Sequence, residues 1–153
     1  MAKNKVESSV SAVRRIFIID DDESVCRSLK CLLGTYGFEA TTFPSGDAFF
    51  SAGKSLDNAC LILDIHLPGM DGWEIQRRLT MHRNIIMLTA HRMEGQQERA
   101  LQAGVAGLLY KPFKVRELVS MIEEVFSANA LLRKKDAVRG SGKLSSSKKV
   151  KKS

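Results

Sequence analysis

A short apolar run that ends in a carboxylate constrains the fold of this chain most strongly. Residues 60–64 are apolar up to Asp64, and a loop with proline and glycine follows at residues 68–72. An apolar run of this length, bounded by turn residues, is typical of a strand buried on both faces of a parallel sheet. Because ligands bind at the carboxyl ends of the strands in open α/β sheets, Asp64 is a candidate functional residue.

Strand-like and helix-like segments alternate along the rest of the chain. The other expected strands cover residues 15–20, 38–43, 85–89 and 107–110. Helical spacing of apolar residues predicts helices over residues 23–33, around 48–50, and over 72–82, 94–103 and 115–131. This alternation predicts an α/β fold with a parallel sheet and helices on both faces. Right-handed crossovers leave few topologies, and the flavodoxin-like (βα)5 sandwich of three layers, with strand order 2-1-3-4-5, is the leading one.

The distribution of charge predicts how the chain is organised. The formal net charge is +7, but residues 131–153 hold nine Lys/Arg and one Asp, whereas residues 1–130 hold fifteen basic and sixteen acidic side chains. We therefore expect a nearly neutral folded domain over residues 14–130, after a flexible lead-in over residues 1–13. The basic segment 131–153 cannot bury a core, and we expect it to be a disordered tail.

Other features bear on the environment of the protein. No apolar run approaches the roughly 18–20 residues of a membrane-spanning helix, and the N-terminus lacks the apolar stretch of a secretory signal. The three cysteines form no paired metal-ligand spacing, and free thiols are the simplest interpretation: Cys26, Cys31 and Cys60. We therefore expect a cytoplasmic protein without a membrane span.

Polar side chains end four of the predicted strands: Asp20 and Asp21, Asp64, Thr89, and Lys111. Parallel strands bring these side chains to one edge of the sheet, where three carboxylates would repel one another and need a cation. Ligands that are all oxygen, with room for water, favour Mg²⁺. A carboxylate can also act as a nucleophile and form an aspartyl-phosphate, while an ammonium and a hydroxyl group bind phosphoryl oxygens. The set therefore predicts phosphoryl chemistry.

Each residue also has an ordinary structural interpretation. An aspartate at the end of a strand often caps a turn or a helix, and the acidic run at residues 20–23 would stabilise a helix N-terminus through the helix dipole. Thr89 alone is typical of a strand-end hydroxyl group, and Lys111 alone of a solvated lysine. The joint placement of these residues at the ends of neighbouring strands is what favours a functional site.

As a set, these motifs resemble the receiver domain of two-component response regulators, the CheY-like family, over residues 14–129. The matching motifs are the acidic pair Asp20-Asp21, Asp64 with Pro68-Gly69-Met70-Asp71-Gly72, Leu88-Thr89-Ala90, and Lys111-Pro112-Phe113. The resemblance implies that Asp64 is the phospho-acceptor, Thr89 the switch hydroxyl group, and Lys111 the lysine that contacts the phosphoryl group. The metal ligands it implies are Asp20, Asp21, Asp64 and the backbone carbonyl of His66, with Asp21 the more direct carboxylate.

The resemblance also implies partners. The phosphoryl donor would be a phosphohistidine on a sensor histidine kinase or on a phosphotransfer protein, and the chain would be a monomer or a phosphorylation-dependent dimer. It would be a signalling domain and not an enzyme, with only self-phosphorylation and self-dephosphorylation chemistry. The downstream partner is not implied by any residue.

Two local features depart from the pattern or extend it. Many receivers carry Tyr or Phe three residues before the lysine, but here Leu108 stands at that position and Tyr110 is the nearest aromatic residue. Strand alternation places Leu108 and Tyr110 on the same face of the sheet. His66 and His91 each lie two residues after a site residue, and we hypothesise that they affect the lifetime of an aspartyl-phosphate through the access of attacking water. The alternative is that they are two exposed loop histidines without a role. His82, near a helix end, is expected at the surface.

Other functions compete with the phosphorylated switch. The chain could be a pseudo-receiver that binds partners without phosphorylation, although the intact set of site residues favours the switch. A hydrolytic phosphatase would need a separate acid or base, which the sequence does not supply. The basic tail could contact nucleic acid or an acidic surface, although its lack of aromatic residues weakens binding to single strands.

Overall fold

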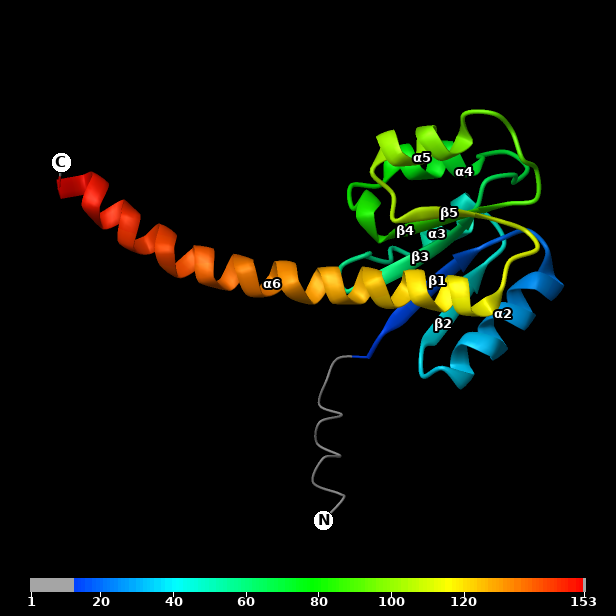
Figure 1. Ribbon diagram of the computed structural model, residues 1–153, viewed down its shortest axis with the longest axis horizontal. Helices are drawn as coiled ribbons and strands as arrows, with labels where there is room; N and C mark the ends of the chain where they lie inside the picture. Colours follow the sequence, from blue (N-terminus) through cyan, green and yellow to red (C-terminus); the bar gives the residue numbers. More distant parts are fainter. Residues whose placement is uncertain (1–12, 153) are drawn as a thin grey trace, which may run out of the picture.

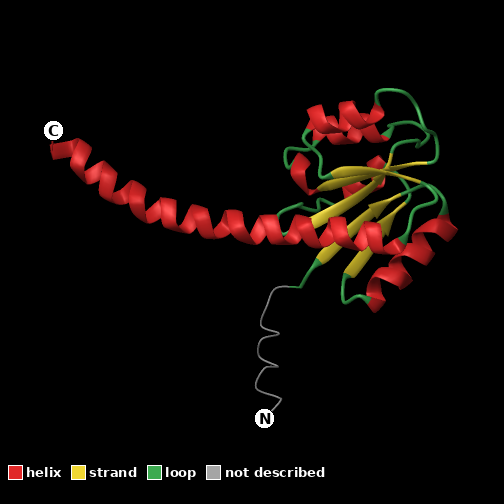
Figure 2. Ribbon diagram, viewed as in Figure 1, coloured by secondary structure: helices red, strands yellow, loops and turns green. Residues whose placement is uncertain are grey.

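The computed structural model describes the backbone of residues 13–152 and the side chains of residues 13–138. One parallel sheet has the strand order β2-β1-β3-β4-β5, with helices on both sides (Figures 1 and 2). The strands are β1 (Arg15–Ile19), β2 (Glu39–Phe43), β3 (Ala59–Asp64), β4 (Ile85–Thr89) and β5 (Gly107–Tyr110). The predicted flavodoxin-like order is confirmed. The lead-in expected over residues 1–13 lies, apart from Val13, outside the described residues.

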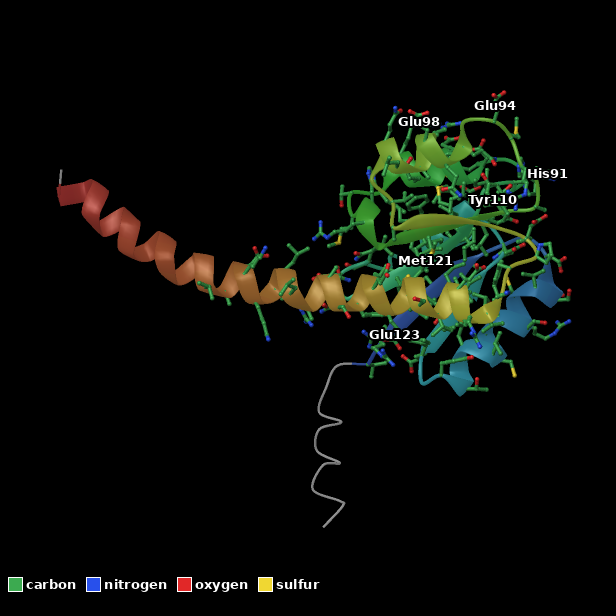
Figure 3. The ribbon with its side chains drawn as sticks, viewed as in Figure 1. His91, Glu94, Glu98, Tyr110, Met121 and Glu123 are labelled. Carbon is green, nitrogen blue, oxygen red and sulfur yellow. The ribbon has the colours of Figure 1, made fainter. Side chains whose placement is uncertain are left out.

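The helices cover the two faces of this sheet. They are α2 (Glu23–Thr35), α3 (Gly46–Ser51), α4 (Gly72–Arg78), α5 (Gln96–Ala103) and α6 (Val115–Lys152), with a 3-10 turn η1 (His82–Asn84). The first turns of α6 are held against the sheet by buried Leu118, Ile122 and Val125. In addition, Arg14 pairs with Glu123 of α6 at 2.7 Å. Figure 3 labels Glu123 on this helix.

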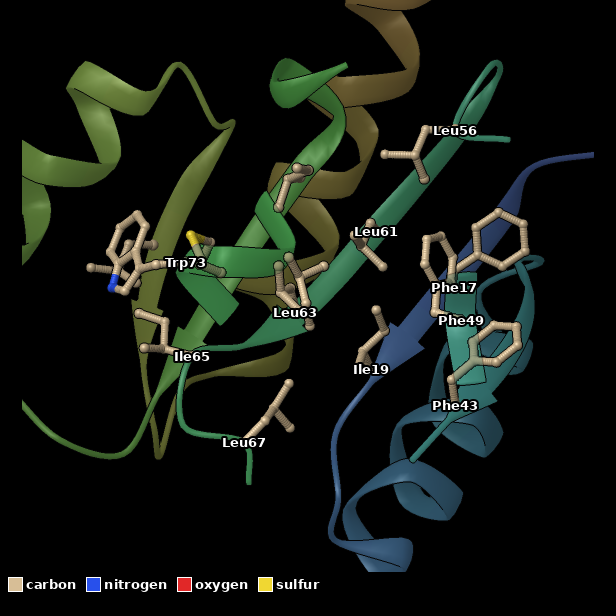
Figure 4. Packing of buried hydrophobic residues seen from close by; sticks show 14 of the residues in the cluster. Phe17, Ile19, Phe43, Phe49, Leu56, Leu61, Leu63, Ile65, Leu67 and Trp73 are labelled. Carbon is tan, nitrogen blue, oxygen red and sulfur yellow. The ribbon is translucent and has the colours of Figure 1, made fainter. Parts of the chain in front are cut away.

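Alternating side chains of the strands build two hydrophobic cores. In β1, Phe17 and Ile19 join the core that also contains residues of α3, α4 and α5 (Figure 4). Ile16 and Ile18 point the other way and join the core that contains residues of α2 and α6. This alternation is the period of two expected for a strand, and because both faces are covered the strands read as continuous apolar runs.

Register aligns the strand ends that carry the polar residues. Ile19 pairs with Leu63, so Asp20 and Asp64 follow at adjacent positions of neighbouring strands. Asp64 in turn pairs with Leu88 of β4, which is the residue before Thr89. The carboxyl ends of β1, β3 and β4 therefore meet at one edge of the sheet.

Short polar side chains begin three of the helices. Asp22 accepts hydrogen bonds from the backbone N–H groups of Ser24 and Val25 at 2.9 and 3.3 Å. Ser45 and Asp71 cap α3 and α4 in the same manner. Each cap satisfies backbone donors that have no partner within the helix, which fixes where the helix starts.

Two helices are shorter than the sequence predicts. The helix expected over residues 72–82 ends at Arg78, because Leu79 has an extended backbone with φ of −97° and ψ of 155°. Leu79 and Met81, which follow the helix, both pack against the core shared by α4 and α5. His82 follows in η1, where it is half-buried and its ring contacts the carbonyl of Leu79. The helix expected from residue 94 begins at Gln96, because Gly95 has a left-handed backbone with φ of 82°.

Disorder was expected for residues 131–153, but α6 continues as a helix to Lys152 (Figure 1), and Ser153 lies outside the described residues. The packed turns from Val115 to Asn129 provide the helix nucleus, and each further residue then adds without the unfavourable nucleation step. Leucine, alanine, lysine and arginine predominate in residues 130–135, and all four are strong helix formers. Composition alone predicted a segment without a core, but a helix that extends from a folded domain needs no core of its own. Among residues 13–152, no helix combines the length and apolar character required to cross a bilayer.

Candidate functional site

Three aspartates meet at the carboxyl edge of the sheet. Carboxylate oxygens of Asp20, Asp21 and Asp64 all lie within 4.8 Å of one another. Asp20 and Asp64 are buried, with 2% and 7% of each residue exposed, whereas Asp21 is open to solvent. Asp20 is held in place because its backbone N–H donates to the carbonyl of Phe43 in β2. The structure therefore contains the cluster of three carboxylates that the sequence predicts.

Lys111 brings a positive charge to this cluster from the end of β5. Its Nζ lies 3.1 Å from Oδ2 of Asp20 and 3.5 Å from Oδ2 of Asp64. Burial opposes the charged form of this lysine, but the carboxylates of Asp64 and Asp20 outweigh burial and raise the pKa of Lys111 above its usual value. The ammonium group is therefore charged at neutral pH and neutralises only part of the three carboxylates. The peptide bond between Lys111 and Pro112 is cis.

The surroundings of Asp64 make its ionised form less favourable. Burial raises the pKa of Asp64, and although Lys111 acts in the opposite direction, the Asp20 carboxylate raises the pKa further. The two oxygens of Asp64 differ, since Oδ1 accepts a hydrogen bond from the His66 N–H at 3.2 Å while Oδ2 faces Lys111. A carboxylate in this position gains stability from any additional cation that enters the site.

Gly72 closes the loop that follows β3. Its N–H donates to the carbonyl of Ile65 at 2.8 Å. A Cβ at position 72 would lie 2.6 Å from both the carbonyl oxygen of Asp64 and the Cα of Ile65. Only glycine therefore lets the start of α4 approach the backbone that carries Asp64. The sequence placed Gly72 in a turn but did not reveal this contact.

Asp22 belongs to the helix and not to the carboxylate cluster. Its side chain caps α2, and a hydrogen bond from the Ser24 hydroxyl group, together with those from backbone N–H groups, lowers the pKa of Asp22. Its own backbone N–H donates to Oδ1 of Asp20 at 2.9 Å. Asp20 and Asp21 therefore belong to the carboxylate cluster, as the functional interpretation of the acidic run predicts. Asp22 caps the helix, as the structural interpretation predicts.

Thr89 ends β4 with a fully buried hydroxyl group. Oγ1 accepts a hydrogen bond from the His91 N–H at 3.0 Å and donates to the His91 carbonyl at 3.2 Å. The hydroxyl group is therefore engaged by its own loop, one residue beyond the register partner of Asp64. Thr89 can donate to a group bound on Asp64 only after it releases the His91 carbonyl.

His66 and His91 meet above the same edge of the sheet. Their ring centroids lie 4.4 Å apart with an interplanar angle of 76°, and both side chains are exposed. The two loops that follow β3 and β4 are thereby in direct contact. The sequence paired the two histidines only by their equal offset from site residues, and the structure places the rings against each other.

Leu108, which stands where many receivers carry Tyr or Phe, is part of the core. Leu108 is buried, and both Leu108 and Tyr110 belong to or pack against the core shared by α3, α4 and α5, which confirms that the two side chains share a face. The Arg92 guanidinium lies 4.0 Å from the centroid of the Tyr110 ring. Nothing in the sequence spacing indicated this contact, since Arg92 lies in the loop that follows Thr89.

The cysteines play no part in this chemistry. Cys26, Cys31 and Cys60 are free, as expected. Burial raises the pKa of the Cys60 thiol, and burial with the nearby Asp20 raises the pKa of Cys26, so both thiols stay protonated at neutral pH. The Cys26 thiol donates to the backbone carbonyl of Asp20 at 3.3 Å, which supports the site from beneath.

The donor set of the cluster fits a hard divalent cation. The available ligand atoms are carboxylate oxygens, they converge from two adjacent strands, and their charge exceeds what Lys111 neutralises. Mg²⁺ prefers oxygen ligands and is usually bound by one or two carboxylates together with waters and phosphate oxygens. The carbonyl of His66 was also predicted as a ligand, and that role remains a prediction.

The sequence model of the family described as "Response regulator receiver domain" matches residues 16–123. The chain is 32% identical over 126 residues to the transcriptional regulatory protein FixJ of Bradyrhizobium diazoefficiens, covering 80% of this chain and 62% of FixJ. It is 33% identical over 121 residues to the transcriptional regulatory protein SrrA of Staphylococcus aureus, covering 78% of this chain and 48% of SrrA. Thus the chain spans only about half to three-fifths of the length of these curated relatives.

Solved structures agree with this assignment. The response regulator StyR superposes with a TM-score of 0.74 and 34% identity, covering 85% of this chain and 67% of the StyR chain. A response regulator receiver domain protein from Clostridium thermocellum superposes with a TM-score of 0.70 and 28% identity, covering 78% of this chain and 99% of that chain. This chain belongs to the CheY-like receiver domains of response regulators, and its place is in two-component signalling.

Proposed function

We propose that this receiver domain accepts a phosphoryl group on Asp64 from a partner phosphohistidine, in a reaction that depends on Mg²⁺. The observation that carries the proposal is the convergence of three carboxylates within 4.8 Å, with Lys111 in contact with two of them. Such a set provides a nucleophile, a metal site and a fixed positive charge at one edge of the sheet.

The transfer is a substitution at phosphorus. An oxygen of the Asp64 carboxylate attacks the phosphorus atom, a new O–P bond forms, and the P–N bond to the donor histidine breaks with its electron pair left on nitrogen. Lys111 lies close enough to Asp64 to contact the phosphoryl oxygens once they arrive. Asp20, Asp21, Asp64 and the carbonyl of His66 would hold Mg²⁺, which when bound supplies neutralisation of the carboxylate and phosphoryl charges.

Phosphorylation would change the loop after β4 through Thr89. A phosphoryl oxygen on Asp64 is a stronger acceptor than the backbone carbonyl of His91, so the Thr89 hydroxyl group would transfer its donated hydrogen bond to the phosphoryl group. The His91 carbonyl then loses its partner, and the segment from His91 to Gly95 is free to repack. With Leu108 in the core in place of an aromatic residue, this rearrangement proceeds through other packing than an aromatic relay.

The remaining parts of the proposal concern partners and location. The donor is a sensor histidine kinase or a phosphotransfer protein, and the output is a change in binding to a downstream partner, as a monomer or as a phosphorylation-dependent dimer. The domain transfers phosphate only to and from its own Asp64 and is not an enzyme for free substrates. We propose the cytoplasm as its location.

Phosphate uptake from acetyl phosphate tests the proposal. Wild-type protein and the Asp64→Asn variant are incubated with the phosphodonor, with and without Mg²⁺, and the incorporated phosphate is measured. We expect uptake only by the wild type and only with Mg²⁺. A folded wild-type protein that takes up no phosphate would favour the pseudo-receiver, which binds partners without phosphorylation.

A further inference from the structure

Helix α6 projects beyond the domain that it helps to build (Figure 1). Its side chains up to Asn129 are buried at helical intervals against the sheet, whereas Leu131 and Val138 are 57% and 72% exposed. The helix nevertheless continues to Lys152. We call residues 131–152 the extension of α6. It has no role in the proposed phosphorylation.

The net positive charge of the chain lies in its C-terminal segment. Residues 131–153 contain nine Lys/Arg and one Asp, while the rest of the chain is close to neutral. Within the described side chains, Arg133, Lys134 and Lys135 are all exposed. Cations gathered on a projecting helix concentrate positive potential away from the acidic cluster of the domain, and such a surface attracts polyanions.

We propose that the extension of α6 is a binding arm for double-stranded nucleic acid, contacting the phosphate backbone without reading base sequence. At about 1.5 Å per residue, twenty-two helical residues span about 33 Å. One turn of B-form DNA is about 34 Å long and presents one negative charge per about 1.7 Å. The arm and one turn of duplex therefore match in length and carry opposite charge.

Other polyanions and other surfaces fit the arm less well. A helix that lies on a membrane needs an apolar face rich in Trp, Phe or Leu, but residues 131–153 hold three leucines and no aromatic residue. Single strands are bound by aromatic side chains on which bases stack, and these too are absent from the segment. A second copy of the arm would bring +8 against +8, which opposes self-association.

A fluorescence anisotropy titration tests the proposal. The full-length, unphosphorylated protein is titrated against a labelled duplex of about three helical turns in about 50 mM and about 200 mM salt. The test variant combines Arg133→Gln, Lys134→Gln and Lys135→Gln, because glutamine retains helix propensity while removing charge. If all three side chains contact phosphates, the slope of log affinity against log salt becomes shallower by about 2 to 3.

A matched variant separates the arm from total charge. Arg27→Gln, Lys30→Gln and Lys54→Gln remove the same number of charges from exposed positions on the domain. This control is expected to keep the wild-type salt slope and an affinity within about twofold of it. Circular dichroism shows whether both variants retain the wild-type helix content.

Three results would overturn the proposal. They are no binding to duplex at the lower salt concentration, an equal loss of affinity in the two variants, and tighter binding to single-stranded DNA, polyglutamate or anionic lipid vesicles than to duplex at equal charge. None of these measurements uses a phosphodonor or Mg²⁺. A failed nucleic-acid arm and a failed phosphorylation site would therefore be distinguished.

Discussion

Removing the charge of Asp64 should stabilise the protein in the absence of divalent cations. Because burial and the Asp20 carboxylate raise the pKa of Asp64, its ionised form is less favourable in the folded protein than in the unfolded chain. Ionised Asp64 therefore destabilises the fold at neutral pH. Asparagine has nearly the same shape, can still accept the hydrogen bond from the His66 N–H, and carries no charge.

The size of the stabilisation by Asp64→Asn follows from the distances between Asp64 and the neighbouring charges. With an effective dielectric constant of about 20, two unit charges at the 4.8 Å upper limit of separation in the cluster repel by about 3.5 kcal/mol, and an ion pair at 3.5 Å attracts by about 5 kcal/mol. Asp64 has two such repulsions and one attraction, which leaves about 2 kcal/mol unfavourable. Because Asp21 is exposed and screened, we expect Asp64→Asn to gain about 1 to 2 kcal/mol, or about 3 to 6 °C in Tm.

Thermal unfolding followed by circular dichroism measures this gain, with Asp57→Asn as a control for the same change at an exposed aspartate. The direction in which this stabilisation depends on pH follows from the raised pKa of Asp64. The destabilisation by Asp64 is absent below the unfolded pKa of about 3.9, grows as pH rises through the folded pKa, and is complete above it. The advantage of Asp64→Asn should therefore be present at pH 7 and vanish near pH 4. Added Mg²⁺ should stabilise the wild type more than the variant.

A lower Tm for Asp64→Asn than for wild type at pH 7 without Mg²⁺ would refute this reasoning. It would mean that the ion pair with Lys111 outweighs burial and the repulsion from Asp20 and Asp21. A gain that stays constant between pH 4 and pH 7 would point to a cause other than the charge.

Three other substitutions test the way the site is built. Gly72→Ala should lower the free energy of unfolding by about 1 to 3 kcal/mol and slow phosphate uptake, because its Cβ would press on the backbone of Asp64 and Ile65; wild-type urea unfolding would contradict this. Asp22→Ala should lower the urea midpoint of unfolding through loss of the α2 cap. It should leave the Mg²⁺ affinity measured by titration calorimetry within about twofold of wild type, so a large loss of affinity would make Asp22 a ligand. Lys111→Gln should destabilise the protein without Mg²⁺ by about 3 kcal/mol, since a buried carboxylate loses its cation, and an unchanged urea midpoint would show that Lys111 contributes no net stability.

Local sequence patterns were sufficient to predict the sheet and the residues at its edge. Buried parallel strands read as apolar runs, and the crossover rule then orders them, so Asp20, Asp64 and Thr89 could be assigned to neighbouring strand ends. Lys111 followed from the same argument at the end of β5. These predictions succeeded because period and chirality are properties of the chain that do not depend on particular contacts.

What could not be predicted depends on contacts between distant segments or on cooperativity. The early end of α4 depends on the extended backbone that Leu79 adopts, and the approach of Gly72 to Asp64 depends on how the loop folds back. The engagement of Thr89 by the backbone of His91 is likewise a tertiary detail. The length of α6 was missed because helix propagation from a packed segment is not visible in local composition.

Locating the phosphoryl group tests the central claim most directly. The protein is treated with acetyl phosphate and Mg²⁺, the acyl phosphate is reduced with borohydride, which converts the modified aspartate to homoserine, and the peptides are sequenced by mass spectrometry. If Asp64 is the phospho-acceptor in a Mg²⁺-dependent reaction, homoserine appears at position 64 alone and does not form when Mg²⁺ is withheld. Homoserine at position 20 or 21, or none in a folded protein that binds Mg²⁺, would contradict it.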